Sequence, residues 1–404
     1  MTVGWDAVAD VEWSRLFHAY GMAADTPAHL RALTSDDGDD RRAAIDHLWS
    51  AVIHQGTPWS VTPPAALVVA GLLAAPSMST PAAGSIGAAM GADPPPLRAT
   101  LLSFLAAVAA AGLPGLSDDE LSASAFPPGR EPEIAAALEA ILADDEGEAW
   151  ESDEIEAIMN RVVVEIRAAA PAIMEAAGAC LVDDDSRVRV NAAHALSALA
   201  ALPGMADRRD ALTTRMEAAA HLAAHRDERA ALVMAMGELG AAPRAFLSDP
   251  DPAVRACAAL APALAGEVAA TGEILAALAD PRAADGWFTN RPPQFRGHVR
   301  FTLIAAAAAR VSRFEELLPA AVAVAAVGNA YTVDSDWGPL LRAAFPDPGD
   351  PPEPPARLTE AQRAYLGALV ANDELWDTRI GNARWAFTRV GLPYDREACR
   401  RFVK

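Results

Sequence analysis

Cysteine is nearly absent from this chain. Its 404 residues include only three, Cys180, Cys257 and Cys399, which are far apart and odd in number. This argues against a disulfide framework and for a reducing compartment, so we expect a cytoplasmic protein. No Cys-x-x-Cys pair occurs in the sequence, and a zinc site built from thiolates is therefore not expected.

Long apolar runs are missing as well. Stretches such as LLSFLAAVAAAG at 101–112 and LIAAAAARV at 303–311 fall short of the roughly 20 residues needed to cross a bilayer. The first residues carry Asp6, Asp10 and Glu12 instead of a basic segment followed by an apolar core. We therefore expect neither a membrane span nor a secretion signal.

Positive charge is in short supply. Lys and Arg number 33 against 54 Asp and Glu, which gives a formal net charge of -21. Such a surface repels polyanions, and phosphate contacts need clustered Lys and Arg, so we expect no nucleic acid and no anionic membrane as a partner. The acid excess keeps an alanine-rich protein soluble; attraction of a basic partner is the alternative interpretation.

The common signatures of catalysis are not found either. The sequence has no GxSxG, P-loop, GxGxxG or kinase motif. Glu217, His221 and His225 share one helix face, but position 222 is Leu, so the general base of an HExxH metalloprotease is missing. We interpret these three residues as a solvated polar stripe, and we expect no metal and no cofactor. Enzyme activity is the less favoured expectation.

The chain does have a recurring phrase: an acidic turn, an arginine, and then an alanine-rich apolar helix. It reads SDDGDDRRAAIDHLWSAVI at 35–53, VDDDSRVRVNAAHALSALA at 182–200 and SDPDPAVRACAALAPALAG at 248–266, with a weaker copy, AHRDERAALVMAMGELG, at 224–240. Such repetition is typical of stacked helix pairs, each of which buries its apolar face against its neighbours. No segment alternates with period 2, so we predict an all-α solenoid without a sheet.

Composition divides the chain into three parts. Residues 1–345 are expected to form the solenoid, starting with a short helix over 6–21 and interrupted by loop-rich breaks at 77–96 and 114–132. Residues 346–357 are rich in proline and read as a linker. Residues 358–404 are expected to form a helical cap, because a terminal unit must cover the last apolar face.

The repeated unit resembles the HEAT repeat, in which Asp and Arg flank the turn into the second helix. The resemblance implies that such Asp–Arg pairs link adjacent repeats; the matching pairs are Asp40 and Arg42, Asp185 and Arg189, and Asp251 and Arg255. Stretches at 13–57 and 358–403 are similar to bacterial HEAT-repeat proteins of mostly unassigned role. The resemblance implies a soluble binding or scaffold protein and does not imply a reaction. HEAT-like DNA glycosylases need a basic face, and because this chain is so acidic we do not favour a glycosylase function.

The strongest functional candidate is the interrupted stretch DPRAADGWFTNRPPQFRGHVR at 280–300. It places a long loop in a tight stack and forms a basic, aromatic island in an acidic chain. Aromatic and Arg side chains are typical binding anchors. In the alternative interpretation, the arginines belong to the repeat and the tryptophan fills a gap. The candidate binding residues are Trp287, Asn290, Arg291, Arg296, His298 and Arg300.

A second candidate loop, GNAYTVDSDWGP, follows at 328–339. Loops one repeat apart in a solenoid tend to lie on the same edge, so the two loops could line one site with opposite charges. In the alternative interpretation, the aspartates form turns and cap helices. The candidates here are Tyr331, Asp334, Asp336 and Trp337.

The third candidate is the group His54, Gln55 and Trp59, which we expect to lie near His18 and Tyr20. Polar residues at the end of an apolar helix could face a groove. The favoured alternative is a helix C-cap in which His54 interacts with the last carbonyls and Gly56 takes the left-handed conformation.

Two functions are consistent with these observations. The favoured one is a binding scaffold that captures a protein or peptide partner, basic in character, on a concave face or loop edge; an immunity, inhibitor or assembly role is one version of it. The alternative is a small-molecule-binding protein or an enzyme of specialised metabolism. In that case a closed pocket would be lined by Arg291, Arg296, His298, Tyr331, Asp334 and Asp336.

Overall fold

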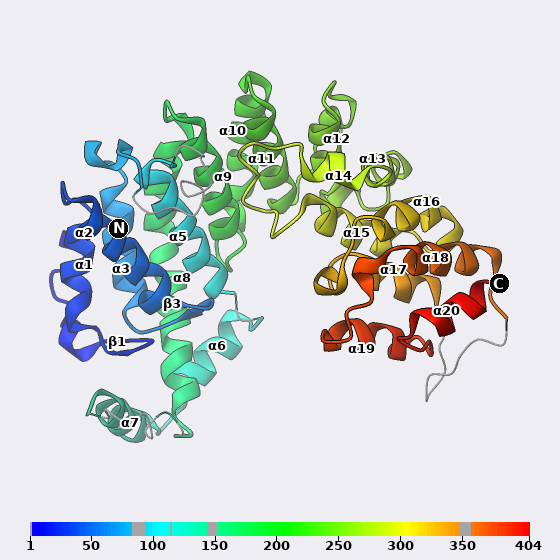
Figure 1. Cartoon of the computed structure of the whole chain (residues 1–404). Coiled ribbons are helices and arrows are strands. Elements are labelled where there is room, and N and C mark those ends of the chain that lie inside the picture. Colours follow the sequence, from blue (N-terminus) through cyan, green and yellow to red (C-terminus); the bar gives the residue numbers. More distant parts are fainter. Residues whose placement is uncertain (1, 83–93, 114, 144–149, 151, 347–356) are drawn as a thin grey trace. The chain divides into compact units, whose positions relative to one another are not determined.

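A computed structural model describes residues 2–82, 94–113, 115–143, 150, 152–346 and 357–404 (Figure 1). Helices dominate these residues, so the all-α prediction is confirmed. The chain forms two compact units, Met1–Met216 and Glu217–Lys404, which we describe separately. Within the described residues, no helix combines the length and the apolar character needed to cross a membrane.

The first unit is built around one long helix, α8 (Ile155–Ala179). It contacts α3 (Thr62–Leu72), α5 (Leu97–Ala111), α6 (Asp118–Ala125), α7 (Glu131–Ala143) and α9 (Ser186–Ala200). Helices α1 (Thr26–Ala32) and α2 (Gly38–His47) pack against each other, and α10 (Arg209–Leu222) follows α9. The loop-rich break predicted at 114–132 contains the short helix α6. Much of the other break, 83–93, lies outside the described residues.

The N-terminal segment differs from the prediction. A helix over 6–21 is wrong: the chain forms 3-10 turns η1 (Trp5–Val8) and η2 (Trp13–Arg15), then a hairpin of β1 (Phe17–His18) and β2 (Gly21–Met22). The apolar spacing suits a helix, but tertiary contacts override it. The backbone N–H of Phe17 donates to Ser60 Oγ at 2.8 Å, and its carbonyl accepts from the N–H of Val61 at 3.3 Å.

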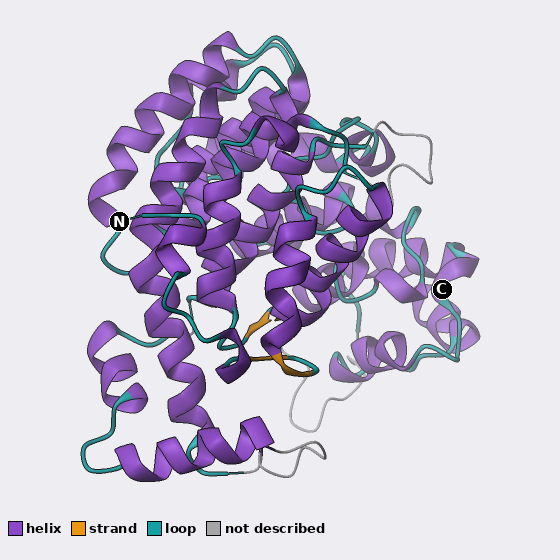
Figure 2. Ribbon diagram, turned by 90° about the vertical axis from the view of Figure 1, so that its left-hand side faces the viewer, coloured by secondary structure: helices purple, strands orange, loops and turns teal. Residues whose placement is uncertain are grey.

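A second hairpin joins β3 (Ile53–His54) to β4 (Thr57–Pro58) (Figure 2). We predicted no strand, so these two hairpins, with two residues in each strand, were not predicted. Gln55 and Gly56 form its turn with φ of 51° and 86°. Two positive φ values are what a tight type I′ hairpin turn requires. Gly56 is therefore left-handed as expected, but in a hairpin and not in a helix C-cap.

The recurring phrase forms a recurring structure: an arginine that closes the turn before its own helix. Its guanidinium donates to the carbonyl six residues earlier in all four copies. The bonds are Arg41 to Ser35 at 2.6 Å, Arg189 to Asp183 at 2.7 Å, Arg229 to Ala223 at 2.7 Å and Arg255 to Asp249 at 3.0 Å. In three copies an Asp caps the helix by accepting the N–H two residues later; these caps are Asp37, Asp185 and Asp251.

This geometry changes the register of the first copy. In the first copy, Asp37 and Arg41 take the places that Asp and Arg take in the pairs of the other copies. The expected pair, Asp40 and Arg42, does not form, because Arg42 pairs with Asp39 at 2.7 Å and Asp40 accepts from the hydroxyl of Ser35. Links to neighbouring helices use other partners. Asp251 bonds Arg226 of α11 (Arg226–Glu238) at 2.5 Å, and Arg255 bonds Glu273 of α13 (Val268–Leu278) at 2.8 Å.

In the second unit, each helix contacts its nearest or next-nearest helix along the chain. Contacts join α11 to α12, α12 to α13, α13 to α15, α15 to α17, α16 to α18 and α18 to α20. Residues 347–356 of the expected linker lie outside the described residues, and α18–α20 of the expected cap fold into this unit. The elements not yet given are α12 (Pro252–Ala259), α14 (Pro281–Asp285), α15 (Val299–Arg310), α16 (Phe314–Ala325), α17 (Trp337–Ala344), α18 (Glu360–Ala371), α19 (Gly381–Arg389) and α20 (Arg396–Val403).

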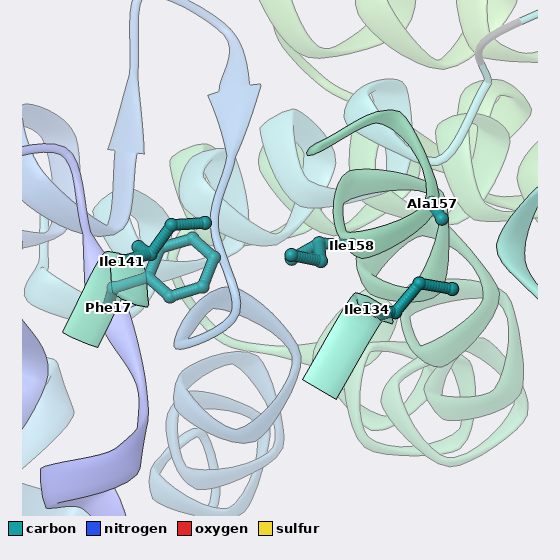
Figure 3. Packing of buried hydrophobic residues seen from close by; sticks show 5 residues of the cluster. All are labelled: Phe17, Ile134, Ile141, Ala157 and Ile158. Atoms are coloured by element: carbon teal, nitrogen blue, oxygen red, sulfur yellow. The ribbon is translucent and has the colours of Figure 1, made fainter. Parts of the chain in front are cut away.

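Small residues allow close packing in the first unit. The backbone of Gly4 lies against Gly71 of α3, where an added Cβ would come within 2.3 Å of the Gly4 Cα. Larger apolar side chains gather where β1 meets the α7–α8 pair, and Figure 3 shows Phe17 beside Ile141, with Ile134, Ala157 and Ile158 in the same cluster. The N-terminal segment is thereby fixed against α3 and the α7–α8 pair.

Candidate functional site

Three of the candidate loop residues are buried and hold the second unit together. Arg300 is 4 % exposed and bridges Asp285 and Asp336, the latter at 3.3 Å. Trp337 is fully buried, and its indole N–H donates to the carbonyl of Asn329 at 2.9 Å. Burial raises the pKa of the Asp336 carboxyl, while Arg300 opposes that shift. Arg300, Asp336 and Trp337 therefore serve the core and are not available to a partner.

The other candidate residues of the 280–300 loop are exposed, except for Trp287, which is half-buried. The loop is held against α11, because Arg226 donates to the carbonyl of Trp287 at 2.8 Å and the N–H of Asn290 donates to Asp227 at 2.6 Å. Arg291 and Arg296 are exposed and form no bond with the described residues. His298 is also exposed and lies 3.3 Å from Asp285.

The second loop contributes two exposed side chains. Tyr331 is 72 % exposed, and Asp334 accepts from the amide of Asn382 at 2.6 Å. Arg300 and Asp336 do bring the two loops together, but they meet through buried side chains in the core. The proposed small-molecule pocket thus loses Asp336, one of its six residues, to the core.

A groove runs along α8 inside the first unit and was not predicted. Three adjoining cavities of about 700, 600 and 730 Å³ follow one side of this helix. Its floor consists mostly of alanines, namely Ala168, Ala169, Ala172, Ala176 and Ala179. Positions 165 to 179 cover about 21 Å of helix, four turns, at 1.5 Å per residue. The groove is therefore long enough for an extended or helical peptide.

The walls of the groove come from distant parts of the unit. One wall is the N-terminal segment with α3, including Val8, Leu16 and Pro64. At the other end, Leu212 and Arg215 of α10 line the third cavity. Because these segments are up to 200 residues apart, no local sequence signal could reveal the groove.

Most of the charge in the groove that has no opposite charge beside it is negative. Within the described part of the chain, Asp6, Glu165 and Glu175 line the groove without a hydrogen-bond or ion-pair partner. Three of its arginines pair with carboxylates: Arg15 with Glu139, Arg98 with Asp183 at 2.6 Å and Arg208 with Asp207 at 3.4 Å. Arg215 donates to the carbonyl of Gly178 at 2.8 Å and keeps its positive charge. Burial raises the pKa of the Glu165 carboxyl, which marks a site where a counter-charge would be favourable.

The two units differ sharply in charge. Residues 1–216 contain 31 Asp and Glu and 13 Arg, whereas residues 217–404 contain 23 Asp and Glu and 20 Lys and Arg. The first unit therefore carries 18 of the 21 net negative charges. The acid excess is a property of the unit that holds the groove, and a uniform solubilising surface does not explain it.

A histidine cluster lies in the same unit, where the first hairpin meets α1 and α2. His18 Nε2 is 3.2 Å from Asp25 Oδ1, and the ring of His18 lies edge-on to that of His47, with centroids 5.3 Å apart. His47 stacks on His29 at 4.2 Å, and its Nε2 lies 2.8 Å from the hydroxyl of Thr26. His18 and His47 are buried, while the Asp25 side chain is 53 % exposed.

The surroundings of His47 keep it neutral. Burial, with the neighbouring His29, lowers its pKa from 6.5 to about 4, although Asp25 opposes the shift. The N–H of Tyr20 donates to His18 Nδ1 at 3.1 Å, so in a neutral ring the Nε2 of His18 carries the proton shared with Asp25. The cluster in this state is an uncharged pair of imidazoles beside one carboxylate.

The third sequence candidate borders this cluster. His54 Nδ1 donates to the carbonyl of Ser50 at 2.9 Å, as the cap interpretation expects, and the hydroxyl of Tyr20 lies 3.4 Å from the same nitrogen. Gln55 is an exposed turn residue. Trp59 packs in the core against Phe17 and Trp150, so it does not face a partner.

Comparison with known proteins adds no family. No protein-family model matches the chain, and no curated protein shows significant similarity to it. The HEAT resemblance, the solenoid arrangement of the whole chain and the Asp–Arg links between repeats therefore remain predictions. Function has to be argued from the groove and the histidine cluster.

Proposed function

We propose that this protein is a binding scaffold that captures a basic, helical segment of a protein partner in the α8 groove. The observation that carries the proposal is the charge inside the groove: among the described residues, the charged side chains that line it without any partner are Asp6, Glu165 and Glu175, all carboxylates. A Lys or Arg side chain entering the groove would find partners that the protein itself leaves unused. The three buried, unpaired cysteines suit a reducing compartment such as the cytoplasm.

Shape supports a helical segment as the occupant. Helix-in-groove recognition needs an apolar floor over several turns, with charged groups at its rim. Alanines on α8 let a partner helix approach closely, and the apolar side chains of Val8, Val11 and Leu67 form part of one wall. Small alanine side chains on one helix suit larger apolar side chains on the other.

The exposed arginines of the 280–300 loop offer a different kind of contact. Arg291 and Arg296 would bind a carboxylate, and they lie in the nearly neutral second unit. A small-molecule pocket between the two loops has less support, because Arg300 and Asp336 use their charges on each other. The groove is thus the better candidate for the partner surface.

The test is a binding measurement with two matched peptides. One is a helical peptide of about 18 residues with lysines along one face and leucines along the other, long enough to span the groove. The second has glutamates in place of the lysines. Fluorescence anisotropy should show binding of the lysine peptide alone, and the affinity should fall as salt is added, because salt screens exposed charges.

Charge variants connect that binding to the groove. Glu165→Gln with Glu175→Gln should weaken the lysine peptide by about 3–10-fold, since an exposed ion pair contributes about 0.2–1 kcal/mol. The control, Asp119→Asn with Glu133→Gln, removes the same charge from exposed positions of α6 and α7 outside the groove. Equal affinity for both peptides, no binding of either, or equal losses in the two double variants would contradict the proposal.

A further inference from the structure

The histidine cluster of the first unit has the composition of a metal site. Among the described residues, His18, Asp25 and His47 form the one group of three or more metal-ligating side chains whose ligand atoms lie together, all within 4.8 Å of one another. Two imidazoles and one carboxylate form a common ligand set for divalent first-row transition metals. We propose that these three residues bind such an ion, with Zn²⁺ as the reference case, and this assignment does not depend on the proposed function of the groove.

The distances are close to those of a metal site. Ligands at about 2.0–2.1 Å from a tetrahedral ion lie roughly 3.4 Å apart. The His18–Asp25 separation of 3.2 Å already matches. The other separations, at most 4.8 Å, must shorten. The half-exposed side chain of Asp25 has the freedom to move toward the imidazoles, and a shorter distance between His18 and His47 requires rotation of their rings. Exposure of Asp25 also gives the ion a path from solvent.

Fixed elements carry the two histidines. His18 lies on β1, which is held through the backbone of its neighbour Phe17 to Ser60 and Val61. His47 is the last residue of α2, and its ring is held by Thr26 and by stacking on His29. Three protein ligands leave at least one coordination position for water or another molecule.

Metal binding also requires a change in the hydrogen bonding of His18. The ion would replace the proton on His18 Nε2, and the ring then stays neutral only if Nδ1 takes up a proton. The N–H of Tyr20, which now donates to Nδ1, would have to turn away. The loss is one hydrogen bond. Gly21, with φ of 122°, and the exposed Tyr20 side chain leave the turn free to change.

The experiment uses the full chain, freed of metal by a chelator and titrated with Co²⁺ and then Zn²⁺. We expect one ion per chain, visible absorption of Co²⁺ typical of nitrogen and oxygen ligands, and displacement by Zn²⁺. Asp25→Asn and His47→Gln should each weaken binding by at least about 10-fold, the loss that even a residue behind the ligands produces. The Tyr20 amide should shift in the ¹⁵N–¹H NMR spectrum on Zn²⁺ binding.

Control variants distinguish metal binding at this site from nonspecific metal binding to other histidines. His221→Gln with His225→Gln removes two histidines of the other unit, and His54→Gln removes the histidine that lies beside Tyr20; neither should change the affinity. Asp25→Asn removes an exposed carboxylate that makes no helix-capping bond, so the fold should persist. The proposal is overturned if no stoichiometric binding occurs, if Asp25→Asn binds like the unaltered chain, or if the Tyr20 amide is unmoved.

Discussion

Acid should destabilise the metal-free protein through His47. Its pKa is 6.5 when unfolded and about 4 in the fold, chiefly because the folded protein buries the ring. The unfolded chain therefore binds the extra proton first, and stability falls as the pH drops from about 6.5 to about 4. At 1.36 kcal/mol per pKa unit the full loss is about 3 kcal/mol, of which about 1.4 kcal/mol is lost by pH 5.5.

The measurement is urea denaturation followed by circular dichroism, at pH values from about 7.5 to about 4, with a chelator present. His47→Gln is the matched variant, because its amide reaches a similar depth and can still bond Thr26 but does not titrate. The difference between the two stability curves removes the carboxylates that both proteins share. Parallel curves over this range would refute the assigned burial and neutrality of His47.

Four further substitutions test other parts of the structure. Arg300→Met leaves the buried Asp336 without its partner and should cost about 3–5 kcal/mol in urea denaturation, and normal stability would contradict the buried bridge. In Gly71→Ala the added methyl group would collide with the backbone of Gly4, so this change should destabilise the fold and abolish peptide binding in the groove. In Gly272→Ala the added methyl group meets no atom within 4 Å, so this change should stabilise α13 by up to about 1 kcal/mol. Gln55→Asn places a residue that tolerates positive φ in the hairpin turn, so it should raise the free energy of unfolding by up to about 1 kcal/mol and with it the melting temperature. A lower melting temperature would argue against the type I′ turn.

The local features of this fold could be predicted from the sequence. The phrase around Arg189 and Arg255 contains both the Asp cap and the arginine that closes the turn, all within seven residues. Such contacts depend only on the nearby chain, so the pattern repeats wherever the phrase does. The first copy was assigned to Asp40 and Arg42 instead of Asp37 and Arg41 because three aspartates and two arginines lie within positions 37–42.

The functional sites could not be predicted in the same way, because distant segments build them. His18, Asp25 and His47 have no regular spacing, and only the packing of β1 on α1 and α2 brings them together. The sequence drew attention instead to His221 and His225, whose spacing suits one helix face. That prediction is wrong, because α10 ends at Leu222, His225 precedes α11, and His221 stacks on Phe246. The groove along α8 likewise depends on the docking of Gly4 against Gly71.

The groove and the histidine cluster lie two residues apart along the backbone, at the start of the first hairpin. Leu16 lines the groove and His18 belongs to the cluster, while Ser60 both lines the groove and bonds the backbone of Phe17 between them. Occupants of the two sites would therefore be linked thermodynamically. If an ion at His18 changes the affinity of the groove by some factor, the groove's ligand must change the affinity for the ion by the same factor. A peptide titration with and without Zn²⁺ would measure that coupling directly.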